Sequence, residues 1–118
     1  MEAKVAFIVD DQQEVRESLR NALQSRGWLV HESNSAVNAI KRWPFLRPRP
    51  NVLVSDLRME SLNAGLALAN ELARDHPALK VVIVSGFLTG FENIPAHYSY
   101  MRKPFGVKDF CALMDRIK

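Results

Sequence analysis

The sequence predicts an α/β domain built on an open, doubly wound parallel sheet. Five short segments, three of them nearly all apolar, read as strands and alternate with segments of helical periodicity. Such alternation is typical of parallel strands joined by right-handed crossovers, with helices on both faces of the sheet. The length of 118 residues fits one domain, which we place at residues 1–118. A closed eight-stranded barrel would need roughly twice that length.

Five short strands are predicted, and three of them are apolar runs that contain two or more valines. The five strands cover residues 5–9, 28–32, 51–56, 80–84 and 98–102. The third run follows a proline-rich stretch that forbids regular structure, and it ends in Asp56. It reads as a strand buried on both faces, as the centre of a parallel sheet requires.

Four helices are predicted from apolar residues at helical spacing. The first covers residues 12–26 and stops at Gly27. The apolar residues that mark the other three are Val37, Ala39, Ile40 and Trp43 in the second, Leu66, Ala69, Leu72 and Ala73 in the third, and Phe110, Leu113, Met114 and Ile117 in the last. Between the fourth and fifth strands, Gly90 and Pro95 break the pattern, so a helix there is expected to be shortened or irregular.

The composition narrows the class of protein. Hydrophobic residues make up 47% and charged residues 25%, which is the balance of a globular protein rather than a disordered one. The net charge is +3, but the basic residues are scattered apart from one local cluster, Lys41, Arg42, Arg47 and Arg49. We interpret this cluster as a solvated helix end and loop, with attraction of an acidic partner as the alternative. No direct binding of nucleic acid is expected.

The single cysteine and the absence of a leader bear on the compartment. Cys111 excludes an internal disulfide, and its place in an apolar helical pattern indicates a packed residue rather than a nucleophile. No basic-then-apolar leader and no long apolar run is visible. We therefore expect a cytoplasmic protein without a membrane segment.

Polar residues follow four of the predicted strands. Asp10 and Asp11 follow the first, Asp56 ends the third, Ser85 follows the fourth and Lys103 follows the fifth. The carboxyl ends of the strands are where open α/β sheets bind ligands. Three carboxylates gathered there repel one another, which implies a hard cation, and Mg²⁺ suits oxygen ligands. A lysine and a hydroxyl beside it would bind a phosphoryl group, so phosphoryl transfer is the predicted chemistry.

Taken singly, each of these residues has a commoner role, because an aspartate after a strand is often a helix cap or turn residue. Taken together, they make the whole chain resemble a receiver domain of two-component response regulators, similar to the chemotaxis regulators. The resemblance rests on the acid pair, the aspartate, the serine and the Lys-Pro-Phe at residues 103–105, each after the appropriate strand. It implies a flavodoxin-like (βα)5 fold with strand order 2-1-3-4-5.

The resemblance also implies roles for the acidic residues and the lysine. Asp56 would be the nucleophile that takes a phosphoryl group from a histidine kinase or a histidine phosphotransfer protein. Asp11 and Asp56 would bind Mg²⁺ directly, Asp10 would act mainly through water, and the backbone carbonyl of Arg58 would complete the shell. Lys103 would pair with the phosphoryl oxygens.

The resemblance further implies a switch and its outputs. Ser85 would donate to the phosphoryl group, and Tyr100, three residues before the lysine, would turn inward in response. The domain would not be an enzyme in the ordinary sense, since it would catalyse only its own phosphorylation and dephosphorylation. Its output would be a downstream protein or a fused output domain, with a phosphorylation-dependent homodimer as a further option.

Two segments depart from the family pattern. In the loop after Asp56, Glu60 stands where proline is usual and Gly65 comes one residue later than usual. The segment between the fourth and fifth strands is also shorter than usual. Its apolar residues Phe87, Phe91 and Ile94 are interpreted as core contacts, with an apolar partner surface as the alternative.

Two other functions stay open at this point. A receiver-fold protein-docking module with weak or no phosphorylation response is favoured by the irregular fourth segment and opposed by the intact acids and lysine. A phosphatase with an aspartate nucleophile would normally have a second acid two residues after Asp56, where this sequence has Arg58. The phosphoacceptor reading ranks above both.

Overall fold

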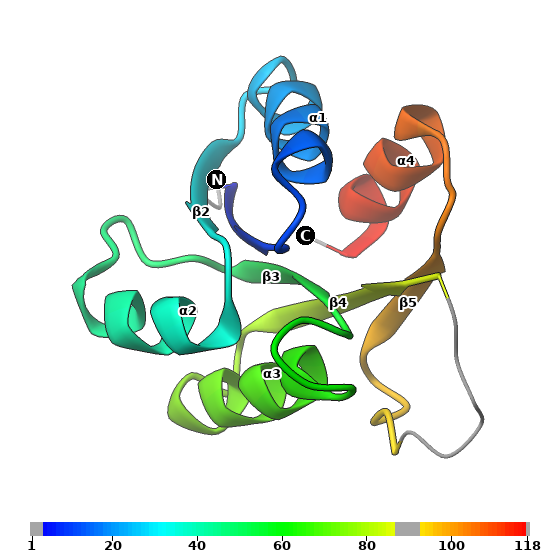
Figure 1. The fold of residues 1–118 in the computed structure, drawn as a ribbon. Helices are drawn as coiled ribbons and strands as arrows, with labels where there is room; N and C mark the ends of the chain where they lie inside the picture. Colours follow the sequence, from blue (N-terminus) through cyan, green and yellow to red (C-terminus); the bar gives the residue numbers. More distant parts are fainter. Residues whose placement is uncertain (1–3, 87–92, 118) are drawn as a thin grey trace.

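The computed structural model describes residues 4–86 and 93–117, which contain a five-stranded sheet (Figure 1). Its strands are β1 Val5–Val9, β2 Leu29–Ser33, β3 Val52–Asp56, β4 Lys80–Ser85 and β5 Ser99–Arg102. They are arranged in the order β2-β1-β3-β4-β5, and every neighbouring pair is parallel. The predicted strand order and parallel sheet are therefore confirmed, with element bounds that shift by a residue or so.

The described residues form four α-helices and one short 3-10 helix. These are α1 Gln13–Gln24, α2 Ala36–Arg42, η1 Trp43–Phe45, α3 Ala64–Asp75 and α4 Val107–Ile117. Helices α1 and α4 lie on one side of the sheet and α2 and α3 on the other, which confirms the doubly wound architecture (Figure 1). None of the described helices is both long and apolar enough to cross a membrane.

Two apolar cores sandwich the sheet. On the side of α1 and α4, Ile8 of β1 packs with Leu23 and Phe110. On the side of α2 and α3, Phe7 of β1 packs with Leu68. Every residue of β1 and of β3 is buried, which explains why both read as continuous apolar runs. Cys111 is buried in the first core, as its sequence context predicts.

The buried stripe of α2 differs from the apolar set expected in its sequence. Ala39 and Trp43 are buried, but Val37 and Ile40 are 56% and 40% exposed. The stripe begins instead at Ala36, so its members stand at i, i+3 and i+7. Small alanines let this short helix lie close to the sheet, and the larger β-branched residues are left on its outer side.

Part of the basic cluster serves the structure of the loop that leads into β3. The Arg49 guanidinium carbon lies 4.1 Å from the centroid of a Trp43 ring, and Arg49 also pairs with Asp75 at 3.6 Å. The indole N–H of Trp43 donates to the same Asp75 carboxylate at 2.8 Å. Arg47 donates to the carbonyl of Leu46 at 2.7 Å. Arg47 and Arg49 thus bind groups of the chain itself, which the interpretation of the cluster as a solvated helix end and loop does not include.

The connection from β4 to β5 contains a turn and no helix in the part that the structure describes. There, Ile94 and Tyr98 pack against the core on the α2 and α3 side. The Tyr98 hydroxyl also donates to Oδ1 of Asn70 in α3 at 2.8 Å. The interpretation of Ile94 as a core contact is confirmed, whereas Phe87 and Phe91 lie outside the described residues.

Candidate functional site

The carboxyl ends of the strands bring most of the predicted site residues to one edge of the sheet. Asp10 directly follows β1, Asp56 ends β3 and Ser85 ends β4. The parallel register pairs Asp56 with Val84, the residue before Ser85. The Lys103 backbone N–H donates to the Ser85 carbonyl at 2.9 Å, one residue beyond the end of β5. Pairing between the strands thus fixes the main-chain positions from which these side chains extend.

Three carboxylates gather at this edge. Asp10, Asp11 and Asp56 each place one carboxylate oxygen within 4.8 Å of the others. Asp10 and Asp56 are buried, and Asp11 is exposed. Because like charges at this spacing repel, a positive charge beside the three carboxylates would stabilise them. Mg²⁺ prefers oxygen ligands and usually retains several waters. Three carboxylates, of which Asp11 is open to solvent, therefore fit this ion.

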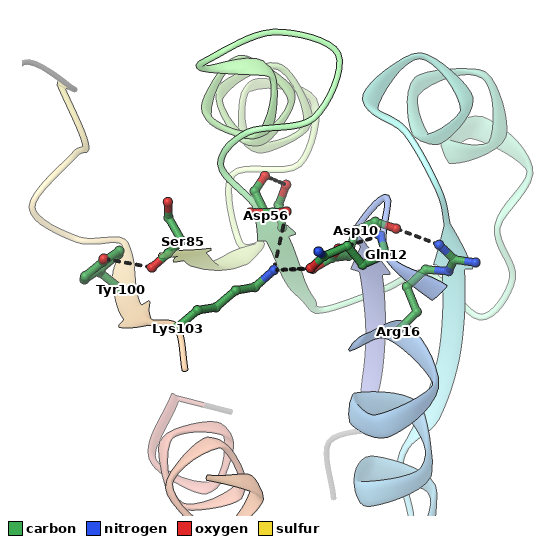
Figure 2. A network of polar contacts seen from close by, with 8 residues as sticks. Asp10, Gln12, Arg16, Asp56, Ser85, Tyr100 and Lys103 are labelled. Atoms are coloured by element: carbon green, nitrogen blue, oxygen red, sulfur yellow. Dashed lines mark hydrogen bonds and ion pairs between the residues drawn. The ribbon is translucent and has the colours of Figure 1, made fainter. Parts of the chain in front are cut away.

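Lys103 supplies one positive charge to the cluster. Its ammonium nitrogen lies 3.0 Å from Oδ2 of Asp10 and 3.5 Å from Oδ2 of Asp56 (Figure 2). It also donates to Oε1 of Gln12 at 3.3 Å. The ammonium is therefore held by three oxygens, and it lies closer to Asp10 than to Asp56.

The electrostatic environment disfavours a charge on Asp56. Burial is the main cause that raises the pKa of Asp56 above the ordinary carboxyl range, followed by the negative charge of Asp10. Lys103 lowers it through its charge and its hydrogen bond, and Asp11 adds a smaller increase. The net effect is a raised pKa, so the protein alone does not fully stabilise the ionised form of Asp56. A divalent cation at this position would relieve that cost.

Asp10 is held by backbone and side-chain contacts on both sides. The backbone N–H of Gln12 donates to Oδ1 of Asp10 at 2.9 Å. Arg16 of α1 donates from Nη1 to the Asp10 main-chain carbonyl at 2.8 Å (Figure 2). Sequence reasoning did not single out Gln12 or Arg16, because both contacts depend on how α1 starts and on side-chain conformation rather than on a motif.

An open cavity of about 320 Å³ lies at the site. Its lining consists of Asp11, Gln12, Asp56, Arg58, Ser85, Gly86 and Lys103. Five of the seven residues predicted for the site therefore meet at one cavity, while Asp10 contacts it through Lys103 and Tyr100 stands apart. Charged and hydroxyl groups dominate this lining, which suits a small anionic group beside a cation.

Ser85 and Tyr100, the predicted switch pair, contact each other through the main chain. The Tyr100 hydroxyl donates to the Ser85 carbonyl oxygen at 3.1 Å (Figure 2). Tyr100 is half-buried and packs against the core on the α2 and α3 side. The ring therefore already points toward β4. A response of this ring to the Ser85 hydroxyl stays a prediction.

Gly65, the glycine that comes one residue later than usual after Asp56, lies where α3 meets the end of β3. It lies in the first turn of α3, and its N–H donates to the Leu57 carbonyl at 2.9 Å. A Cβ added at Gly65 would overlap the carbonyl group of Asp56. The expanded loop thus still delivers a glycine to the point where α3 approaches the end of β3 most closely.

Glu60, the other departure in this loop, caps a helix from a distance. Its Oε1 accepts the N–H of Ala36 at 3.0 Å and its Oε2 accepts the N–H of Val37 at 2.9 Å. Loss of hydration raises the pKa of the Glu60 carboxylate, but hydrogen bonds from these two N–H groups and its own backbone N–H together bring it below the usual range. The sequence marks Glu60 as unusual but gives no signal for its partners, which lie more than twenty positions earlier.

Comparison with known sequences identifies the family independently of the structure. The family model of the response regulator receiver domain matches residues 6–115. The sensor kinase CckA of Brucella abortus is 36% identical over 106 residues, which cover 86% of this chain and 11% of that protein. The transcriptional regulator NtrC of Klebsiella pneumoniae is 31% identical over 123 residues, covering 98% of this chain and 25% of that protein. The chain thus spans a quarter or less of these relatives.

Comparison with solved structures gives the same fold. The chemotaxis protein CheY4 of Vibrio cholerae superposes with a TM-score of 0.84 at 15% identity, covering 99% of this chain and 100% of that one. The receiver domain of the hybrid histidine kinase CckA gives a TM-score of 0.77 at 22% identity, with coverage of 96% and 97%. At these identities the similarity establishes the fold and nothing finer.

Proposed function

Because the chain belongs to the family of response regulator receiver domains, we propose that it accepts a phosphoryl group on Asp56 within a two-component system. The donor would be a histidine kinase or a histidine phosphotransfer protein. One structural observation carries the proposal: Asp56 shares a cavity with Asp11 and Lys103, at the carboxyl edge of the sheet. The protein is then a signalling phosphoacceptor that promotes its own modification, rather than an enzyme acting on an external substrate.

Asp56 is the proposed nucleophile. One of its carboxylate oxygens attacks the phosphorus of a phosphohistidine, the P–N bond breaks, and the bonding electron pair stays on the imidazole nitrogen. The products are an acyl phosphate on Asp56 and an unmodified histidine on the donor. Lys103, whose ammonium lies 3.5 Å from Asp56 Oδ2, would pair with the oxygens of the arriving phosphoryl group.

The proposed Mg²⁺ ligands are Asp11, Asp56 and the main-chain carbonyl of Arg58, with Asp10 acting mainly through water. When bound, Mg²⁺ would neutralise the carboxylates and the charge of the transferred group. The three converging carboxylate oxygens support this assignment, and so does the upward direction of the Asp56 pKa. Arg58 lines the same cavity, which is consistent with its proposed part.

The proposed readout begins at Ser85. Its hydroxyl would donate to the phosphoryl group, and the movement would be transmitted to Tyr100, whose hydroxyl is bonded to the Ser85 carbonyl. The surface around β5 would then change. Support for this step comes from the direct contact between the two residues.

The partners follow from the family and its relatives. CckA is a sensor kinase and NtrC is a DNA-binding transcriptional regulator, so receiver domains occur in both settings. For this chain we propose phosphoryl transfer from a histidine-containing donor and output to a downstream protein or a fused domain. A phosphorylation-dependent homodimer is the alternative form of output.

A mass measurement tests the proposed function. The chain is incubated with Mg²⁺ and acetyl phosphate, beside Asp56→Asn and the control Asp109→Asn, which changes an exposed aspartate on α4. Wild type and the Asp109 variant should gain one phosphoryl group that depends on Mg²⁺, and the Asp56 variant should gain none. Absence of the gain in wild type, with Mg²⁺ shown to bind, would favour a docking module that does not respond to phosphorylation.

A further inference from the structure

We propose that Glu60 is a positioning residue for the phosphoacceptor site, acting through the loop that joins β3 to α3. By tying this loop to the start of α2, Glu60 holds the main chain at Arg58 where a divalent cation can use it. The inference rests on the proposed function, since it concerns the Mg²⁺ ligands named for that function. It assigns to Glu60, which stands where the family usually has proline, a part in setting cation affinity.

The contact between Glu60 and α2 uses both carboxylate oxygens. One accepts the N–H of Ala36 at 3.0 Å and the other accepts the N–H of Val37 at 2.9 Å. Ser35, the residue before the helix, accepts the next N–H, that of Asn38, at 3.0 Å. The first three N–H groups of α2 are thus all bonded, two of them by the loop. Charge-assisted hydrogen bonds of this kind are stronger than neutral ones, so the loop is firmly attached.

Arg58 lies between two anchors of the same loop. On one side, the N–H of Leu57 donates to the Val84 carbonyl of β4 at 2.9 Å. On the other side stands Glu60 with its bonds to α2. One residue, Met59, separates Glu60 from Arg58, which borders the cavity with Asp56. Because both neighbours are fixed, the Arg58 main chain has few conformations to lose when a ligand binds it.

Release of the Glu60 anchor should therefore weaken cation binding. The loop would gain freedom between Leu57 and Gly65, whose N–H donates back to the Leu57 carbonyl at 2.9 Å. A cation that uses the Arg58 carbonyl would then have to order the loop, and that cost would appear as lost affinity. Groups that orient metal ligands without touching the metal commonly change affinity by about tenfold or more when removed.

A purely structural role for Glu60 as a helix cap is the competing explanation, and α2 offers a matched control. Ser35→Ala removes a cap bond at the same helix end, to Asn38, without altering the loop. Loss of either cap should cost a similar amount of helix stability. Only Glu60 connects the helix end to the site. The two variants therefore separate loss of helix stability from loss of loop position.

The experiment compares the full chain with Glu60→Ala, Glu60→Gln and Ser35→Ala. Mg²⁺ affinity is measured by titration of backbone amide resonances, and folding is checked by circular dichroism. Glu60→Ala should weaken Mg²⁺ binding about tenfold, and Glu60→Gln, which keeps one acceptor oxygen, should fall between it and wild type. Ser35→Ala should bind as wild type does. The initial rate of uptake from acetyl phosphate should fall in Glu60→Ala at low Mg²⁺ and recover at saturating Mg²⁺.

The outcomes distinguish this inference from the function on which it rests. Wild-type affinity in Glu60→Ala, or an equal loss in Ser35→Ala, would overturn the positioning role even if Asp56 is phosphorylated. If Glu60→Ala does not fold, the same comparison is made with Glu60→Gln, and unchanged affinity there overturns the role. A wild-type chain that binds Mg²⁺ but takes up no phosphoryl group would instead defeat the proposed function, while the affinity comparison would still decide the part played by Glu60.

Discussion

The ammonium of Lys103 lies 3.0 Å from the carboxylate of Asp10, closer than to any other acid in the described site. Asp10 is almost fully buried, so this pair satisfies a charge that water does not reach. The same ammonium stands beside the position proposed for Mg²⁺. Lys103 therefore stabilises the metal-free site and repels the cation that the site is proposed to bind.

Replacement of Lys103 by methionine should change stability and cation affinity in opposite directions. Without Mg²⁺, the free energy of unfolding of the variant should be about 1–3 kcal/mol lower than that of wild type, because the buried Asp10 carboxylate loses a charged partner. Its Mg²⁺ affinity should rise by up to about tenfold, since a positive charge beside the cation is removed. Urea unfolding and Mg²⁺ titration measure the two effects.

Lys108→Met is the control for this change, since Lys108 is exposed on the first turn of α4. It should alter neither quantity appreciably. Weaker Mg²⁺ binding in Lys103→Met would contradict the placement of the cation beside the ammonium.

The raised pKa of Asp56 predicts a pH dependence of stability in the metal-free protein. Burial and the charge of Asp10 raise the pKa in the folded state above its unfolded value. The contribution of Asp56 is then fully present below the unfolded pKa and is lost as the pH rises through the folded-state pKa. Asp56→Asn cannot ionise, so its advantage over wild type should grow across this interval and persist at neutral pH.

Thermal unfolding at a series of pH values measures this difference. At neutral pH without Mg²⁺, Asp56→Asn should melt about 2–5 °C above wild type. At acidic pH the two should converge, and saturating Mg²⁺ should narrow the gap at neutral pH by stabilising wild type. A gap that is independent of pH would show that ionisation of Asp56 is not its cause.

Gly65→Ala should be strongly destabilising even though alanine is the better helix former. Helix propensity alone favours alanine over glycine by about 1 kcal/mol. The added Cβ would overlap the carbonyl group of Asp56, so α3 would have to move away from β3. We expect a net loss of about 2–3 kcal/mol in the free energy of unfolding, measured in urea.

Gly106→Ala serves as the control for a glycine with room. A Cβ there would meet its nearest neighbour, a carboxylate oxygen of Asp109, at 4.0 Å. Its effect should stay below about 1 kcal/mol. Equal losses in the two alanine variants would mean that the approach of α3 to Asp56 is not what requires Gly65.

The contacts of Arg49 predict that it stabilises the loop before β3. Arg49→Met removes the guanidinium that lies over Trp43 and pairs with Asp75. It should cost about 0.5–1 kcal/mol of stability. Lys41→Met removes an exposed charge from the same basic cluster and should cost less, within about 0.5 kcal/mol. Urea unfolding of both variants measures the two losses of stability. A larger loss in Lys41→Met would contradict the stabilising role of Arg49.

The strand ends were predictable from the sequence because parallel pairing leaves little freedom. Once the five segments are assigned to parallel strands, Asp10, Asp56 and Ser85 must lie at the same edge of the sheet. The side-chain contacts within the site were not predictable in this way. That Lys103 also bonds to Gln12 depends on the conformations of two long side chains.

Contacts between loops and helices were less accessible to sequence reasoning. Glu60 reaches Ala36 and Val37 only because the expanded loop runs toward the start of α2, and no local pattern encodes that path. The buried face of α2 predicted from helical spacing was also wrong in part, since its small alanines face the core and Ile40 does not. Helical spacing fixes a stripe, but tertiary packing chooses which stripe is buried.

Asp56 is proposed to carry the phosphoryl group, and locating the modified residue tests this. The chain is phosphorylated by a phosphohistidine donor in the presence of Mg²⁺, the acyl phosphate is reduced with borohydride, and the peptides are sequenced by mass spectrometry. Reduction should convert Asp56 to homoserine and leave Asp10 and Asp11 unchanged. Homoserine at another aspartate, or phosphate retained on a histidine or serine instead, would contradict the account.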